Sequence, residues 1–126
     1  MAIAASLSAG EARSACRTGS KACPALLRMK PGADAVSATG EVSATQPRYY
    51  FTFRARTGQQ ITISAQGGGL KTGAGFPIRF PDGNGDAISE NIPFALPQTG
   101  RYVIEFLANL MSEGPFGRFK ITMQIK

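Results

Sequence analysis

The chain contains few residues that could catalyse a reaction, and these residues do not form a complete catalytic arrangement. The sequence contains no histidine, which excludes Ser-His-Asp triads, Cys-His dyads and histidine-ligated metals. Acid–base hydrolysis of glycosides needs two carboxylates that face one another. The eight acidic residues fall mostly in turns or tails, and no pair shares an obvious buried face. We therefore predict that the protein is not an enzyme and holds no cofactor.

Two loops contain residue types that are typical of ligand sites. Residues 81–86, PDGNGD, place carboxylate and amide oxygens at alternate positions, as calcium loops do. Ala87 stands where such a loop needs glycine, and Pro93 where it needs a bidentate glutamate. Residues 67–75 lack the G-x-x-x-x-G-K-[ST] spacing of a phosphate loop. We interpret 81–86 as a plain turn, with calcium as the alternative, and 67–75 as a connecting loop; no metal site is predicted.

Cys16 and Cys23 bracket a short loop. A disulfide formed in an oxidising compartment is the preferred interpretation, and two free thiols in a reducing cytosol are the alternative. Two cysteines without histidine make a poor zinc site. Residues 1–15 lack the basic and long apolar regions of an intact signal peptide, and are either its trimmed end or a loose tail. We predict a flexible N-terminal tail with a cysteine loop over 1–23 and a single domain over 24–126.

The chain is basic, with a net charge of +6 and a pI near 9.8. Nucleic acid, an anionic envelope surface and an acidic enzyme cleft would each suit this charge, although many soluble secreted proteins are mildly basic. Tyr50, Arg54 and Arg56 share one face of an extended segment and form a possible second surface, which could stack on a sugar or a nucleotide. Export would remove nucleic acid as the usual partner. No apolar run of about 18 residues exists, so no membrane span is predicted.

Hydrophobic residues alternate with polar ones along most of the sequence, a pattern typical of strands with one buried face. The pattern is strongest in 49–64, YYFTFRARTGQQITIS, where Thr57-Gly58 interrupts two alternating runs and predicts a β-hairpin. It is clearest in 119–126, FKITMQIK. With 15 glycines and 8 prolines between such runs, we predict an all-β fold: an antiparallel β-sandwich of about seven or eight strands, jelly-roll-like or a closed-barrel variant.

Individual strands allow further predictions. Pro77 cannot donate a ladder hydrogen bond, so the strand over 76–80 is expected at a sheet edge. Tyr102 shares its parity with Ile104 and Phe106, which places it in the core with its hydroxyl tied at a corner. Val103 and Leu107 make the opposite face unusually apolar, so a neighbouring segment or a partner, including a second copy of the chain, is expected to cover it.

Four stretches resemble the bacterial periplasmic inhibitors of g-type lysozyme, and more loosely the pre-peptidase C-terminal domains of secreted enzymes. They are LRMKPGADAVSATGEV, YYFTFRARTGQQITIS, LPQTGRYVIEF and GRFKITMQIK, and the likeness runs from about Ala25 to the C-terminus. Its most specific parts are an A-x-x-G-Q motif, met by Ala55, Gly58 and Gln59, and an L-P-x-[ST]-G-x-Y corner, met by Leu96, Pro97, Thr99, Gly100 and Tyr102.

The resemblance implies an exported, periplasmic or secreted protein without chemistry of its own, which blocks the acidic cleft of a lysozyme. It implies partner-binding roles for the corner and for basic residues near the last strand: Thr99, Gly100, Arg101, Tyr102 and Arg118. Hydroxyl and guanidinium donors would hydrogen-bond cleft carboxylates with charge assistance. The preceding loop, NLMSEGPFG, carries Glu113 and no base before Arg118, where the inhibitors tend to carry several. The alternative is an accessory module that binds envelope glycans or a secreted enzyme.

Overall fold

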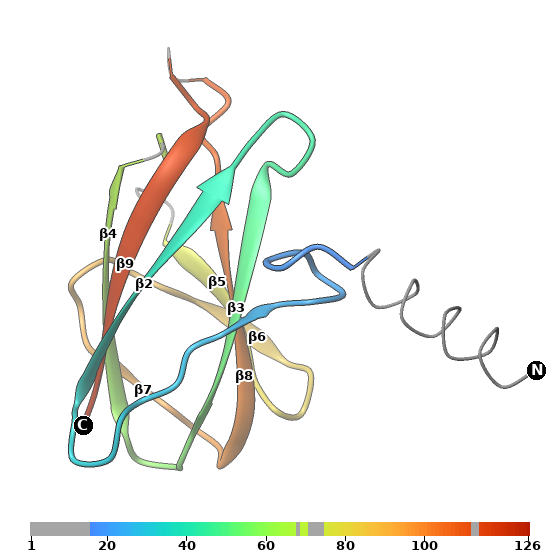
Figure 1. The fold of residues 1–126 in the computed structure, drawn as a ribbon. Helices are drawn as coiled ribbons and strands as arrows, with labels where there is room; N and C mark the ends of the chain where they lie inside the picture. Colours follow the sequence, from blue (N-terminus) through green and yellow to red (C-terminus); the bar gives the residue numbers. More distant parts are fainter. Residues whose placement is uncertain (1–15, 68, 71–74, 112–113) are drawn as a thin grey trace, which may run out of the picture.

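The computed structural model describes residues 16–67, 69–70, 75–111 and 114–126, which form a two-layered β-sandwich (Figure 1). Five strands lie in the order β1-β3-β8-β5-β6 and four in the order β2-β9-β4-β7; all strand pairs are antiparallel except β1 with β3. The strands are β1 Ala25–Leu26, β2 Ala35–Val42, β3 Arg48–Ala55, β4 Gln60–Gly67, β5 Phe76–Arg79, β6 Gly85–Ile88, β7 Phe94–Ala95, β8 Gly100–Leu107 and β9 Gly117–Ile125. The predicted sandwich is confirmed, and its closed-barrel variant is wrong because the two sheets remain separate.

The core fills the space between the sheets with the residues that the alternating pattern predicts. Phe51, Phe106 and Phe119 meet edge-to-face or tilted, with ring centroids 5.6 to 6.3 Å apart. Ile61 and Ile63 on β4 are also completely buried in this core. Full burial of each such side chain is worth about 1.5–3 kcal/mol, so the phenylalanines and isoleucines of β3, β4, β8 and β9 dominate the stability of the sandwich.

The predicted hairpin over residues 49–64 is wrong. β3 belongs to the five-stranded sheet and β4 to the four-stranded sheet, so the two strands do not pair. The turn at Thr57-Gly58, where Gly58 has a φ of 89°, carries the chain from one layer to the other. Both strands still point their apolar residues inward, because each faces the same core from its own side.

The strand that contains Pro77 is also not at an edge, since β5 lies between β8 and β6. Its pairing with β8 covers only Ile78 and Arg79. Pro77 therefore lies just outside that ladder, and the N–H that proline lacks is not needed for it. The turn predicted over 81–86 is confined to its first part. Phe80 donates its N–H to the Asn84 carbonyl at 2.7 Å, and β6 begins at Gly85.

The cysteine loop packs against the sandwich. Cys16 and Cys23 form a disulfide with their Cα atoms 5.9 Å apart. The Gly19 carbonyl accepts the Tyr50 N–H at 2.7 Å, and a side chain at Gly19 would collide with the ring of Tyr49. The loop therefore extends one flank of the five-stranded sheet (Figure 1). The predicted tail over 1–15 lies outside the described residues, as do part of the 67–75 loop and Glu113. No described helix is long and apolar enough to cross a membrane.

Candidate functional site

One end of the sandwich gathers exposed arginines. The register of β3 with β8 places Arg54 directly opposite Arg101, and Ala55 opposite Gly100. Arg56 comes directly after the last residue of β3, and all three arginines are exposed. A hollow of about 280 Å³ opens at this end, lined by Arg54, Ala55, Arg56, Gln59, Thr99 and Gly100. We call this surface the arginine end and define it by Arg54, Arg56, Thr99, Gly100 and Arg101.

The two loops of the arginine end are tied together by their own side chains. Thr57 donates its N–H to Thr99 Oγ1 at 3.0 Å, and its hydroxyl donates to the Pro97 carbonyl at 3.1 Å. Gly58 donates its N–H to the Leu96 carbonyl at 3.0 Å. The turn after β3 and the loop before β8 are thereby held in one arrangement. Thr99, predicted as a contact residue, orders the site, and its hydroxyl proton stays available to a partner.

The backbone conformation at position 100 and the nearby Pro81 ring both require a glycine there. Its φ of 147° is one that side chains rarely adopt, and an added Cβ would lie 2.9 Å from Pro81 Cγ. The neighbouring β5–β6 turn is held to the loop before β8 through Asp82, whose carboxylate accepts the Gln98 side-chain N–H at 2.6 Å. Hydrogen bonds from Gln98, and then from Asn84, lower the pKa of Asp82.

Arg101 and Tyr102 differ in what they offer a partner. Arg101 Nε donates to Thr52 Oγ1 at 2.8 Å, which fixes the base of the guanidinium while its outer nitrogens remain exposed. Tyr102 is completely buried, as predicted from its parity. Its hydroxyl accepts the Gln98 N–H at 3.0 Å and donates to the Gln98 carbonyl. Tyr102 therefore supports the arginine end from within the core, because its hydroxyl fixes the loop at Gln98.

The charges of the arginine end are unbalanced. Within the described ranges, the ion pairs join Arg48 with Glu105 and Arg118 with Glu41, and neither involves Arg54, Arg56 or Arg101. Like charges directly opposite each other on neighbouring strands destabilise a sheet. The facing pair of Arg54 and Arg101 therefore lowers the stability of the isolated protein and is suited to a negatively charged partner.

The remaining predicted contact residues lie elsewhere. Arg118 is the second residue of β9, at the opposite end of the sandwich; its side chain is 88% exposed, and its Nε lies 3.8 Å from a Glu41 oxygen. Tyr50 lies at the far end of β3 from Arg54 and donates its hydroxyl to Glu105 at 3.2 Å. Burial, and then the charge of Glu105, raise the pKa of Tyr50. The structure thus unites Arg54, Arg56 and Arg101 and separates them from Tyr50 and Arg118.

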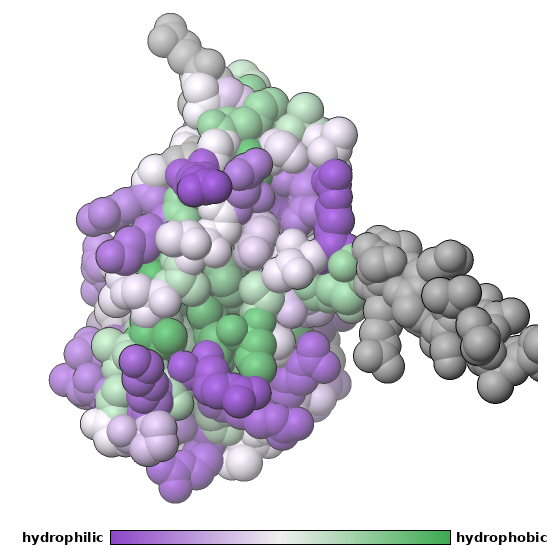
Figure 2. Space-filling view, viewed as in Figure 1, coloured by the Kyte–Doolittle hydropathy of each residue, from purple (hydrophilic) through white to green (hydrophobic). Residues whose placement is uncertain are grey.

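A second exposed feature was missed by the sequence analysis. The loop between β8 and β9 exposes Leu110, Met111 and Phe116, with Met111 94% exposed. We call these three residues the apolar loop. Figure 2 shows hydrophobic surface at the end of the molecule where this loop lies, and also over β1, where Leu26 is exposed. The sequence signal that could have revealed this loop is the presence of apolar residues in a segment between two predicted strands.

The described residues contain no cluster of His, Cys, Asp and Glu that could hold a metal ion. In the 81–86 turn, Asp82 is bonded to Asn84 and Gln98, and Asp86 accepts the Ala87 N–H. These oxygens serve the turn itself.

Comparison with known proteins identifies the fold. No protein-family model and no curated protein sequence matches this chain. Among solved structures, the periplasmic inhibitor of g-type lysozyme from Salmonella Typhimurium superposes with a TM-score of 0.65, at 17% identity over 80% of this chain and 96% of that chain. A mutant of the Escherichia coli inhibitor gives 0.63 at 16% identity, over 81% and 96% of the two chains. The Aeromonas hydrophila inhibitor gives 0.59 at 17% identity, over 81% and 95%. The chain therefore has the fold of the periplasmic g-type lysozyme inhibitors.

Proposed function

We propose that this protein is a non-catalytic, periplasmic or secreted inhibitor that binds a lysozyme and covers its acidic active-site cleft with the arginine end. The observation that carries the proposal is the pair of exposed arginines Arg54 and Arg101, which lie directly opposite each other on neighbouring strands and form no ion pair among the described residues. The fold shared with three lysozyme inhibitors supports the class of partner.

The chemistry follows from the two sets of groups. A glycoside-hydrolysing cleft contains a pair of carboxylates. Arginine presents five N–H donors in a planar fork and binds carboxylates through short, charge-assisted hydrogen bonds. Insertion of Arg54 or Arg101 would occupy the carboxylates and block the path of the substrate. The mutual repulsion of the two arginines would be relieved in the same step.

The bonds between the loops prepare the site for binding. Ordering a flexible loop on association reduces affinity. Here the side chains of Thr57, Thr99 and Tyr102 already fix the loops through bonds to backbone groups. A rigid, cationic protrusion of this kind would lose little entropy on entering a cleft.

The proposed location rests on the cysteine loop as well as on the shared fold. The Cys16–Cys23 disulfide closes a short loop that packs on β3. Disulfides persist in the periplasm and outside the cell and are rare in a reducing cytosol. Intact mass with and without a thiol reductant should differ by two hydrogens; equal masses would remove this support.

The test is titration of the purified protein into a g-type and an i-type lysozyme while lysis of cell walls is followed. We expect lysis by at least one of them to slow at micromolar protein or below, and the inhibition to weaken as salt screens the arginines. Unchanged lysis by both enzymes at micromolar protein would refute the proposal.

A further inference from the structure

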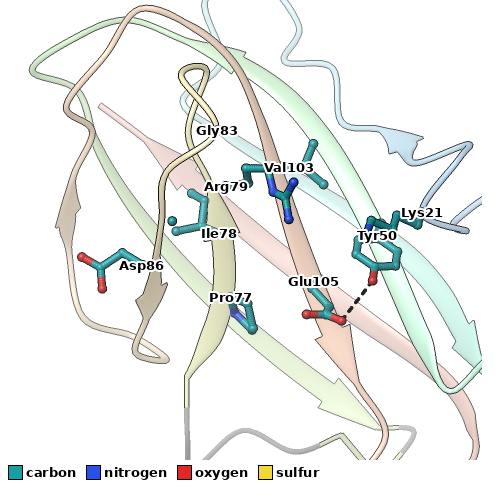
Figure 3. A pocket seen from close by; sticks show the side chains of 10 residues that line it. Lys21, Tyr50, Pro77, Ile78, Arg79, Gly83, Asp86, Val103 and Glu105 are labelled. Atoms are coloured by element: carbon teal, nitrogen blue, oxygen red, sulfur yellow. Dashed lines mark hydrogen bonds between the residues drawn. The ribbon is translucent and has the colours of Figure 1, made fainter.

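A groove runs along the outer face of β8. Two hollows, of about 570 and 550 Å³, share Lys21, Arg79 and Val103 and so adjoin one another. Val103 lies on their floor, and the cysteine loop supplies Lys21 on one side. The β5–β6 hairpin forms the other side. Figure 3 shows Arg79 directed over this floor toward Val103, with Tyr50 and Glu105 across from it.

The groove is positively charged. Among the described residues, Lys21 and Arg79 form no ion pair, and both are exposed. Arg101 borders the second hollow, where its Nε bonds only a neutral hydroxyl. Of the carboxylates, Glu105 is engaged by Arg48 at 3.4 Å and by Tyr50, and Asp86 points away from the centre of the hollow (Figure 3). Unpaired cations therefore outnumber free carboxylates along its length.

The position of the groove limits the kind of polymer that can bind in it. A peptide that adds a strand needs the backbone of a sheet edge. β8 is an inner strand, paired with β3 on one side and β5 on the other. The groove therefore offers side chains: cationic donors, the carboxylate and phenol of Glu105 and Tyr50, and the apolar surfaces of Val103 and Pro77.

We propose that this groove binds a linear anionic glycan, a polysaccharide that carries carboxylates on its sugar rings. Lys21 and Arg79 would bind the carboxylates, and the ring faces would rest on Val103, Pro77 and Tyr50. This surface lies beside the arginine end and goes beyond the proposed inhibition of a lysozyme. It would hold the protein at an acidic polysaccharide.

The disulfide of the cysteine loop would keep Lys21 in position for binding in the groove. Lys21 lies within the loop that the disulfide closes, and this loop is fixed to the sheet through the bond from Tyr50 N–H to the Gly19 carbonyl. Without the disulfide, the loop would lose its closure, and Lys21 would lose its fixed place across the groove from Arg79. The double variant Cys16→Ser/Cys23→Ser is expected to weaken glycan binding severalfold.

The test uses calorimetry with oligogalacturonate as the anionic probe and a chito-oligosaccharide of equal length as the neutral one. The variant Lys21→Gln/Arg79→Gln is compared with Arg118→Gln/Lys120→Gln, which removes the same charge from β9. We expect oligogalacturonate to bind the native protein, the first variant to bind at least tenfold more weakly, and the control to stay within twofold. The neutral sugar should bind at least tenfold more weakly than the anionic one.

Several outcomes would overturn the proposal. They are equal weakening by both variants, which would indicate non-specific attraction, equal binding of the neutral sugar, and binding of oligoglutamate as tight as that of oligogalacturonate. Absence of binding to the native protein would do the same. Both variants should keep the native thermal transition and still inhibit a lysozyme, because they leave Arg54, Arg56 and Arg101 in place. Loss of glycan binding and failure of inhibition can therefore be told apart.

Discussion

The two ends of the sandwich differ in the side chains that they expose. At the arginine end, side chains bond two loops to each other, and the exposed groups are cations. At the other end, the apolar loop exposes Leu110, Met111 and Phe116. β8 runs from one end to the other and separates them by about 25 Å, at roughly 3.3 Å per residue. The comparison shows that one β-sandwich can present chemically different surfaces at its two ends.

The largest expected effect comes from removing the facing arginines. Arg54→Ala/Arg101→Ala should weaken lysozyme inhibition about 100-fold, or about 2.7 kcal/mol, through loss of charge-assisted bonds. Relief of like-charge repulsion should leave the free energy of unfolding unchanged or slightly increased. Inhibition assays and denaturant unfolding measure the two effects. The matched control is Arg118→Ala, which removes one exposed arginine at the other end; an equal loss in that variant would contradict the assignment.

The next effect tests whether the buried tyrosine holds the arginine end. Tyr102→Phe removes the hydroxyl that bonds both backbone groups of Gln98. The free energy of unfolding should fall by about 1–2 kcal/mol, and amide exchange should quicken around Gln98 while the apolar loop is unaffected. Tyr50→Phe removes a half-buried hydroxyl bonded to Glu105 and should cost less. Uniform quickening of exchange across the sandwich would argue against a local role.

A smaller effect is expected from the contact between the loops. Thr99→Val keeps the shape of the side chain and removes the acceptor of the Thr57 N–H, at a cost of about 0.5–1.5 kcal/mol. Inhibition should weaken only severalfold, because the arginines remain. Thr45→Val, on the loop between β2 and β3, is the control. If it reduced inhibition equally, the loop contact would not be specific to the arginine end.

The smallest effects are predicted for the apolar loop and for Asp82. Leu110→Ser/Met111→Ser should change the free energy of unfolding by less than about 0.5 kcal/mol, since both side chains are exposed, and inhibition by less than twofold. A strong loss of inhibition would reverse the comparison between the two ends.

Asp82 makes a pH-dependent contribution. Its folded pKa is lowered by Gln98 and Asn84, so the contact stabilises the protein above the ordinary carboxyl pKa of about 3.9 and is lost as the pH falls through the folded value. An NMR titration should give a midpoint below about 3.9, and Gln98→Ala should raise it. A midpoint that is equal in both proteins would contradict the role of Gln98.

Sequence patterns predicted the faces of strands better than their partners. Alternation placed Tyr102, Ile104 and Phe106 correctly because it depends only on which side of an extended chain is dry. It did not show that β3 and β4 lie in different sheets, since both arrangements bury the same residues. β6 was missed because only Ile88 of its four residues is buried.

The candidate site shows the same limit. Arg54 and Arg101 come together through the register of β3 with β8, which connects segments far apart in the sequence. Arg118 was grouped with Arg101 from the resemblance, but β9 begins at the opposite end of the sandwich. Composition showed a net positive charge that would suit an acidic partner, whereas the place where the positive charges gather depends on strand order.

The crossing of the chain between sheets after β3 has a consequence for the folding rate. β9 forms the middle of its sheet by pairing with β2 and β4, and β8 pairs with β3 on one side and β5 on the other. Ala35 must therefore find Gln124 across most of the polypeptide. Topologies with such distant pairings fold in roughly milliseconds to seconds, and neither layer can be completed during synthesis until its late strands have left the ribosome. Both layers of the sandwich therefore stay incomplete until the segment from β8 onward is available, so the N-terminal half of the chain has no finished sheet of its own.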